Sequence, residues 1–188
     1  LRASHHSLQR LPRQRQDRFA LASHRHAVMA RGALASQIIP VNHVSQDTLI
    51  RPDTSLEALG ALPPVFDRKS GTLTAGNSSP YTDGGAALYV ISPKLEPTVK
   101  PDAYLVDYEF VAVNPKDGLL MGPGKAMLRL LSRKRLKWRD ISYIEIHEAF
   151  AGEVLCNLDA MNSPSYRTNT YGVDYEPGQL EEERINPW

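Results

Sequence analysis

The sequence holds a single cysteine, Cys156, among its 188 residues. One thiol excludes an internal disulfide and any metal site built from paired cysteines, and it is compatible with a reducing compartment. No apolar run approaches the roughly 20 residues that a membrane-spanning helix needs. The formal net charge is only +1, so the charge of the whole chain favours no polyanionic partner.

The composition is typical of a globular protein, because 41% of the residues are hydrophobic and 23% are charged. The length suits one ordinary domain or two small pieces of a larger one. Charge is uneven along the chain, since residues 1–31 carry seven arginines and one acid, Asp17. Such a start resembles a transit peptide. We favour the alternative, in which the arginines from Arg13 onward belong to a folded helix.

Apolar residues at helical spacing predict four helices in the chain. They cover residues 12–31, 55–59, 125–136 and 148–161. Proline is favoured at a helix start and glycine just after a helix end, so Pro12 is expected to open the first helix and Gly32 to end it. Thr54 is the expected N-cap of the second helix.

β-Branched and aromatic residues predict strands over residues 38–41, 103–113 and 141–146. Residues 86–91 form an apolar run that periodicity leaves open as a buried strand or the start of a helix. Residues 162–188 are polar and turn-rich. The order strand, helix, strand, helix in the second half predicts a parallel sheet and hence an α/β fold.

Small and hydroxyl-bearing residues form the block 71–79, with the sequence Gly-Thr-Leu-Thr-Ala-Gly-Asn-Ser-Ser. Glycine lets the backbone approach a ligand closely, and the amides and hydroxyls can bind a phosphate or a pantetheine amide. The spacing is neither that of a phosphate-binding P-loop nor that of GxGxxG. From spacing alone, a tight surface turn stays the competing interpretation.

The residues His147-Glu148-Ala149-Phe150 directly follow the strand predicted at 141–146. Open α/β sheets place their sites at the carboxyl ends of strands. An imidazole at this place can donate a hydrogen bond to a developing oxyanion, or hold a water that does so. Glu148 could orient a neighbour or cap the first turn of the next helix. The competing interpretation is a hydrogen-bonded structural histidine.

A basic run surrounds Trp138. Its members are Arg133, Lys134, Arg135, Lys137 and Arg139. Such a run can contact nucleic acid or acidic lipid, but a solvated helix end explains it more simply. Cys156 lies in the middle of a predicted helix among leucines, without the electropositive setting that a reactive thiol needs. The histidines other than His147 lack the spacing of metal ligands, so we expect no metal site.

Taken together and in order along the chain, these blocks resemble the thiolase family. The resemblance is carried by residues 13–17, 51–56, 64–66, 72–79, 83–84, 86–87, 122–123 and 145–150. Most thiolases carry asparagine at the position of His147. Histidine there resembles the fatty-acid-degrading branch, the β-subunits of trifunctional enzyme complexes. Residues 159–161 and 186–188 resemble the same branch.

The resemblance implies a layered α/β fold and acyl transfer with coenzyme A as a substrate, without a tightly bound cofactor. A cysteine thiolate attacks a 3-oxoacyl-CoA, cleavage leaves an acyl-enzyme and acetyl-CoA, and a second CoA removes the acyl group. By position, His147 would serve an oxyanion hole and Ser79 would contact the pantetheine arm. Arg51 would contact the nucleotide end of CoA, and Phe150 would help wall the acyl or pantetheine pocket.

The comparison with the family also identifies what the chain lacks. The family's nucleophilic cysteine, its glycine-histidine-proline block and its acid/base cysteine match nothing in the sequence, and Cys156 matches neither cysteine. We therefore expect an internal, incomplete piece of a thiolase that is inactive alone. Residues 1–93 are expected to end the N-terminal half, including its loop region, and residues 94–188 to begin the C-terminal half. The alternative is a catalytically dead structural or binding subunit.

The implied partners are acyl-CoA and CoA, together with further copies of the chain or a trifunctional α-subunit. We expect no nucleic-acid partner. Association with a membrane is expected only through the complex. The implied compartment is the mitochondrion in a eukaryote and the cytoplasm in a bacterium. Apolar faces left uncovered by the missing parts predict poor solubility or self-association.

Overall fold

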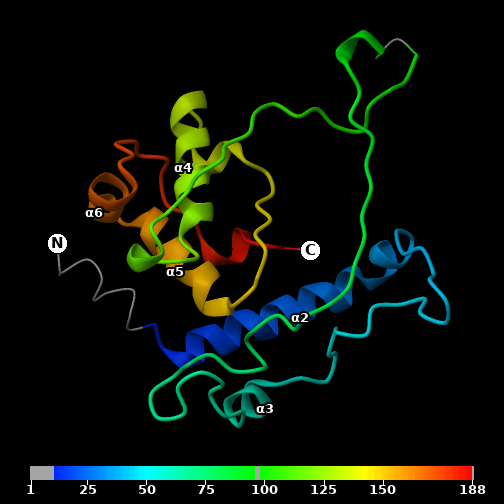
Figure 1. The fold of residues 1–188 in the computed structure, drawn as a ribbon, viewed down its shortest axis with the longest axis vertical. Helices are drawn as coiled ribbons and strands as arrows, with labels where there is room; N and C mark the ends of the chain where they lie inside the picture. Colours follow the sequence, from blue (N-terminus) through cyan, green and yellow to red (C-terminus); the bar gives the residue numbers. More distant parts are fainter. Residues whose placement is uncertain (1–10, 96–97, 188) are drawn as a thin grey trace.

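Helices and short helical turns provide the regular secondary structure of the described residues, 11–95 and 98–187 of a computed structural model (Figure 1). The helices are α2 (Arg13–Ala35), α3 (Leu56–Gly60), α4 (Gly122–Lys134), α5 (Ala151–Asn162) and α6 (Pro164–Tyr166). Turns of 3-10 helix lie at Pro93–Leu95, Pro115–Asp117, Trp138–Asp140 and Glu182–Arg184, and one π-helical turn lies at Arg167–Tyr171. No described helix is both long and apolar enough to cross a membrane.

Some sequence predictions concern residues outside the described ones. These residues are Trp188 and the first ten residues of the stretch that resembles a transit peptide. Two of the histidines, His5 and His6, lie among those ten residues.

The long helix α2 confirms the first helix prediction and corrects its end. Pro12 precedes the first helical residue with an extended backbone (φ −63°, ψ 140°), which its ring favours. Phe19 and Leu21 are buried on the inner side of the helix. The helix continues through Gly32 to Ala35, so the predicted stop at Gly32 is wrong. One glycine costs a helix only about 1 kcal/mol relative to alanine, and the Ala-Leu-Ala that follows favours helix.

The short helix α3 begins one residue later than predicted. Its N-cap is Ser55, whose hydroxyl accepts a hydrogen bond from the Ala58 amide at 3.1 Å, so Thr54 is not the cap. Leu59 is 3% exposed and lies in a small apolar cluster that joins α3 to α2. The other members of this cluster are Ala20, Leu21 and Leu62.

The main hydrophobic core lies between α4 and α5. Leu128 of α4, and Val154 and Leu155 of α5, have no exposed surface. Gly124 allows the two helices to approach closely. Its amide donates to Oδ1 of Asn157 at 2.8 Å, and a Cβ at this position would lie 3.0 Å from the same oxygen.

Both core helices differ from their predicted ends by a few residues. Helix α4 begins at Gly122 with Pro123 in its first turn, and it ends where Arg135 adopts a left-handed φ of +56°. Helix α5 begins at Ala151 rather than at residue 148, because Phe150 keeps an extended backbone (φ −144°, ψ 134°). The block 147–150 therefore lies before the helix and not within it.

The turn-rich segment after α5 closes one side of this core. Tyr166, Tyr171, Leu180 and Ile185 are at most 3% exposed. The rings of Tyr166 and Tyr171 meet edge to face, with their centroids 5.0 Å apart. Asn162 binds both backbone polar groups of Leu180, at 2.8 and 2.9 Å. The polar residues of this segment thus make turns that bring its few apolar side chains into the core.

The strands predicted at 38–41, 103–113 and 141–146 do not form among the described residues, which contain only isolated β-bridges. Residues 86–91 are neither strand nor helix, and they are largely exposed. A strand is stable when neighbouring strands satisfy its backbone groups. In the described part of the chain these segments have no neighbouring strand, only single bridge partners such as Ile185 beside Ile144.

Residues 107–113 nevertheless keep the burial pattern of a strand, in which half-buried and exposed residues alternate. Asp107 and Glu109 face α4, where they pair with Arg133 at 2.9 and 2.7 Å. Tyr108 and Phe110 are 64% and 86% exposed. In Figure 1 the green chain before this segment runs away from the helices and returns to α4. Its aromatic face is thus open to a partner.

We predict that this open segment makes the isolated chain self-associate. The substitution Phe110→Lys places a charge on the exposed edge, which opposes edge-to-edge pairing. It should shift the sedimentation-velocity distribution toward monomer. Gln14→Lys, on the exposed face of α2, adds the same charge and should leave the distribution unchanged. Identical distributions for the wild-type and F110K chains would contradict the prediction.

Candidate functional site

Two blocks that lie far apart in the sequence meet in the structure. The loop 71–79 and the block 147–150 are joined by an antiparallel β-bridge between Ser78 and Phe150. Two hydrogen bonds flank the bridge, from Ser79 N–H to Ala149 C=O (2.9 Å) and from Ala151 N–H to Asn77 C=O (3.0 Å). We call these contacts the loop–block junction. Sequence spacing predicted each block separately but not their contact.

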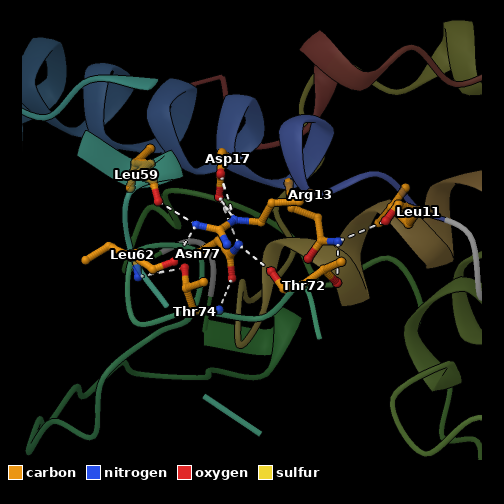
Figure 2. Close-up of polar contacts among 10 residues, drawn as sticks. Leu11, Arg13, Asp17, Leu59, Leu62, Thr72, Thr74 and Asn77 are labelled. Atoms are coloured by element: carbon orange, nitrogen blue, oxygen red, sulfur yellow. Dashed lines mark hydrogen bonds and ion pairs between the residues drawn. The ribbon is translucent and has the colours of Figure 1, made fainter. Parts of the chain in front are cut away.

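The side chain of Asn77 gives the loop its shape (Figure 2). Its Oδ1 accepts from the Thr74 amide at 2.8 Å, and its Nδ2 donates to the Thr72 carbonyl and to Asp17 Oδ1, both at 3.0 Å. Gln16 donates to the Thr72 hydroxyl at 2.9 Å. Asn77 is 2% exposed. At such a buried place an unpaired amide would cost about 1–3 kcal/mol, so the bonded conformation of the loop is strongly favoured.

Asp17 holds Asn77 from helix α2 and is itself held by Arg13. Nε of Arg13 lies 2.9 and 2.8 Å from the two carboxylate oxygens of Asp17. Nη2 of the same arginine donates to the carbonyls of Leu59 at 2.5 Å and Leu62 at 3.2 Å (Figure 2). One ion pair between residues four apart on α2 therefore connects this helix, the end of α3 and the loop.

The predicted oxyanion residue, His147, follows the segment 141–146 and has an exposed side chain. The preceding residue is bound by the side chain of Asn186, with Ile146 N–H 2.7 Å from Oδ1 and Ile146 C=O 2.8 Å from Nδ2. The backbone next to His147 is therefore fixed, while its ring is open to solvent.

The predicted ligand residues Ser79 and Phe150 lie within the junction. Ser79 is exposed, and its hydroxyl lies 3.4 Å from the Pro80 carbonyl. Phe150 is half-buried, and its ring meets that of Phe66 edge to face with a centroid separation of 6.1 Å. The structure thus brings Ser79, His147 and Phe150 into one region.

Arg51 is bound to helix α2 at His24. Its side chain is exposed, and its amide donates to Nδ1 of His24 on α2 at 3.3 Å. Burial lowers the pKa of His24 and the charge of Arg51 lowers it further, while Glu148 acts in the opposite direction. His24 therefore links Arg51 electrostatically to the block 147–150.

The sulfur of Cys156 lies on α5 and is not part of the junction. Burial raises the pKa of the Cys156 thiol to about 11. The residue is therefore a neutral thiol near pH 7, whereas a nucleophile must be a thiolate. This agrees with the prediction of an inert, packed cysteine.

Part of the basic run packs against acids instead of standing free. Arg133 pairs with Asp107 and Glu109, and Arg129 pairs with Glu109 at 3.3 Å. A surface cavity of about 350 Å³ lies here and is lined by Arg129, Arg133, Glu109 and Asp174 among others, none of them a predicted site residue. No group of metal-ligating side chains is present among the described residues.

Comparison with known families decides the assignment. The thiolase N-terminal domain matches residues 5–94, and the thiolase C-terminal domain matches residues 99–174. The chain belongs to the thiolase family. The resemblance drawn from the sequence is confirmed.

Relatives of this thiolase-family chain include the mitochondrial trifunctional enzyme subunit beta of Bos taurus. It is 39% identical over 186 residues, which cover 95% of this chain and 39% of the relative. A probable 3-ketoacyl-CoA thiolase of Caenorhabditis elegans is 37% identical over 186 residues, covering 94% of this chain and 41% of the relative. The chain thus spans about two fifths of the length of these relatives.

Solved thiolase structures match this fold as well. Human mitochondrial 3-ketoacyl-CoA thiolase superposes with a TM-score of 0.76 at 27% identity, covering 95% of this chain and 43% of that one. Acat5 thiolase from Ascaris suum, solved with coenzyme A, superposes with a TM-score of 0.74 at 28% identity, covering 94% and 43%. The predicted fold class, an incomplete thiolase-like α/β fold, is confirmed.

The ion pair of α2 leads to a stability prediction. Asp17→Asn should lower the free energy of unfolding by about 3 kcal/mol, the lower end of the range for breaking a buried ion pair. The lower end applies because the Arg13 side chain is still 22% exposed. Urea unfolding followed by circular dichroism measures the change. Asp53→Asn, at an exposed position, is the control and should differ from wild type by less than about 0.5 kcal/mol. Equal losses in the two variants would refute the prediction.

Glu153, in the first turn of α5, leads to a pH prediction. Burial raises the pKa of Glu153 from 4.5 to about 7. The folded chain therefore holds this proton more tightly than the unfolded chain, and stability falls as the pH rises through this interval. Glu153→Gln keeps the acceptor for Asn157 but cannot ionise. In urea it should match wild type at pH 4 and exceed it at pH 8. A difference of equal size at both pH values would count against this assignment.

Proposed function

We propose that this chain forms part of a thiolase that cleaves 3-oxoacyl-CoA with CoA to acetyl-CoA and a shortened acyl-CoA in fatty-acid β-oxidation. The observation that carries the proposal is the loop–block junction, which places Ser79 and Phe150 near His147. The names of the relatives support it, since they are 3-ketoacyl-CoA thiolases and trifunctional β-subunits. Because the chain spans about two fifths of their length, the proposal concerns a whole enzyme to which this chain contributes a part.

The proposed CoA-binding residues match different parts of that ligand. Ser79 exposes a hydroxyl, which can exchange hydrogen bonds with an amide of the pantetheine arm. Phe150 offers an aromatic surface at the same junction. Arg51 carries a charge that pairs well with phosphate, so the proposal assigns it to the nucleotide end of the ligand.

The proposed role of His147 is to donate a hydrogen bond to an oxygen that becomes negative during the reaction. In the first step a cysteine thiolate attacks the 3-keto carbon. The bond between the second and third carbons breaks. The third carbon remains on sulfur as an acyl thioester, and the electron pair stays on the second carbon as the enolate of acetyl-CoA, which a general acid protonates. Cys156 is unsuited to supply this thiolate because burial raises its pKa. The nucleophile and the general acid must come from elsewhere in the enzyme.

The division of the chain belongs to the same proposal. Residues 1–93 would end the N-terminal half of the enzyme, and residues 94–188 would begin its C-terminal half. The loop–block junction would then join the two halves. The assembly would contain further copies of the chain or a trifunctional α-subunit, in the mitochondrion of a eukaryote or the cytoplasm of a bacterium.

A structural or binding subunit without catalysis is the second candidate function. The single, protonated cysteine favours it. The intact mass of the native protein separates the two functions. A mass near 20.9 kDa favours the subunit, whereas a mass that includes further thiolase sequence favours the enzyme.

Titration calorimetry with CoA tests the proposed binding residues. Arg51→Ala should weaken CoA binding about tenfold, which corresponds to roughly 1.4 kcal/mol, because a contact between charges is lost. Arg31→Ala removes an equal charge from an exposed position on α2 and should leave the affinity unchanged. If R51A and R31A chains bind CoA equally well, the proposed contact is wrong.

A further inference from the structure

The block 147–150 is held at its upstream end by one asparagine side chain. The amide of Asn186 bonds both backbone polar groups of Ile146, and the backbone N–H of Asn186 donates to the Ile144 carbonyl at 2.9 Å. Ile144 also forms a parallel bridge with Ile185. The carboxamide of Asn186 thus replaces the next pair of backbone hydrogen bonds that a parallel strand would make to Ile146. Only a side chain with both an acceptor and a donor can do this.

Asn186 is itself held in an uncommon conformation. Its φ of +49° lies in the left-handed region, which asparagine tolerates better than most residues. Its carbonyl accepts from Nδ1 of His26 on α2 at 2.8 Å, so the long helix supports this conformation. Backbone strain of this kind persists where the surrounding contacts impose it, and it is concentrated at functional sites.

The direction of His147 follows from its neighbours. Exposure alternates from Glu145 to Glu148, with residues 146 and 148 half-buried and residues 145 and 147 exposed. Nδ2 of Asn186 donates to Oε1 of Glu148 at 2.5 Å, so the half-buried side is the one that faces Asn186. His147 therefore points to the opposite side of the chain.

The downstream end of the block is held by the loop–block junction, which also depends on an asparagine. The carbonyl of Asn77 accepts from the Ala151 amide, and its side chain makes hydrogen bonds to Thr74, Thr72 and Asp17. The block thus runs between two fixed points, each set by an asparagine whose carboxamide is fully engaged. Among the described contacts the His147 ring takes part in no hydrogen bond, which leaves it available to a ligand.

We propose that Asn186 and Asn77 are positioning residues that hold the block 147–150 from its two ends and so set where the imidazole of His147 lies. The inference rests on the proposed function in one respect, the use of His147 as a hydrogen-bond donor. Such a donor must be placed within about 0.5 Å to be effective, and an exposed side chain on an unheld segment would not meet that requirement.

Hydrogen exchange in the complete chain tests the upstream contact. Asn186→Asp keeps the size of the side chain but removes its donor and sets a second carboxylate beside Glu148. Amide exchange at residues 146–151 should become at least tenfold faster, whereas exchange in α4 should stay at the wild-type rate. Asn114→Asp is the matched control, because aspartate can still accept from the Lys116 amide at that exposed turn. Unchanged exchange at 146–151, or an equal rise throughout the chain, would overturn the proposal.

The ring of His147 provides a second readout that general stability does not move. In a carbon-edited NMR spectrum, the ring signals of His147 should change in N186D at temperatures where circular dichroism is that of wild type. Glu148→Gln, a milder variant, should give a smaller change in the same direction. Ring signals identical to wild type in both variants would contradict the proposal. If the wild-type chain binds no CoA, the CoA contacts proposed for this chain fail, but this comparison still decides the positioning role.

Discussion

The carboxylate of Asp17 lies buried between the guanidinium of Arg13 and the side-chain amide of Asn77. Through Arg13 it fixes the carbonyls at the end of α3, and through Asn77 it shapes the loop 71–79. The backbone of that loop in turn holds the start of α5 and the residues before it. The candidate site therefore depends on an ion pair that touches none of the proposed ligand residues. Removing the charge would leave the cation of Arg13 without its carboxylate and one N–H of Asn77 without its charged acceptor.

Much of the helical structure follows from the sequence, because amphipathic spacing and terminal signals act locally. Helix ends proved harder to predict. Gly32 lies inside α2, since its cost is small against the alanines and leucine around it. The strand-like segment 107–113 has the right side-chain alternation, but strand formation depends on distant partners that local sequence does not reveal. The sequence therefore predicts the α/β class of the family better than the secondary structure of this chain.

The candidate site, like the fold, is predicted by the sequence only in part. Ser79, His147 and Phe150 belong to blocks that stand out by composition, and the structure brings these blocks together. Asn77 and Asn186 lie in stretches that the sequence singles out, but their roles do not stand out, because an asparagine in a turn-rich segment is ordinary and its buried hydrogen bonds appear only after folding. Arg13 and Asp17 carried one readable signal, an arginine and an acid four residues apart at a helix start. That signal suggests a surface pair, whereas the carboxylate is 3% exposed.

The central claim is that the loop 71–79 and the block 147–150 are joined by their backbones. The most direct test is a nuclear Overhauser measurement between the α-protons of Ser78 and Phe150 in the complete chain. These residues form the non-hydrogen-bonded pair of an antiparallel bridge, in which the α-carbons lie about 4.5 Å apart. The account predicts a strong cross-peak between the two α-protons. Its absence, with the signals of both residues resolved, would contradict the account.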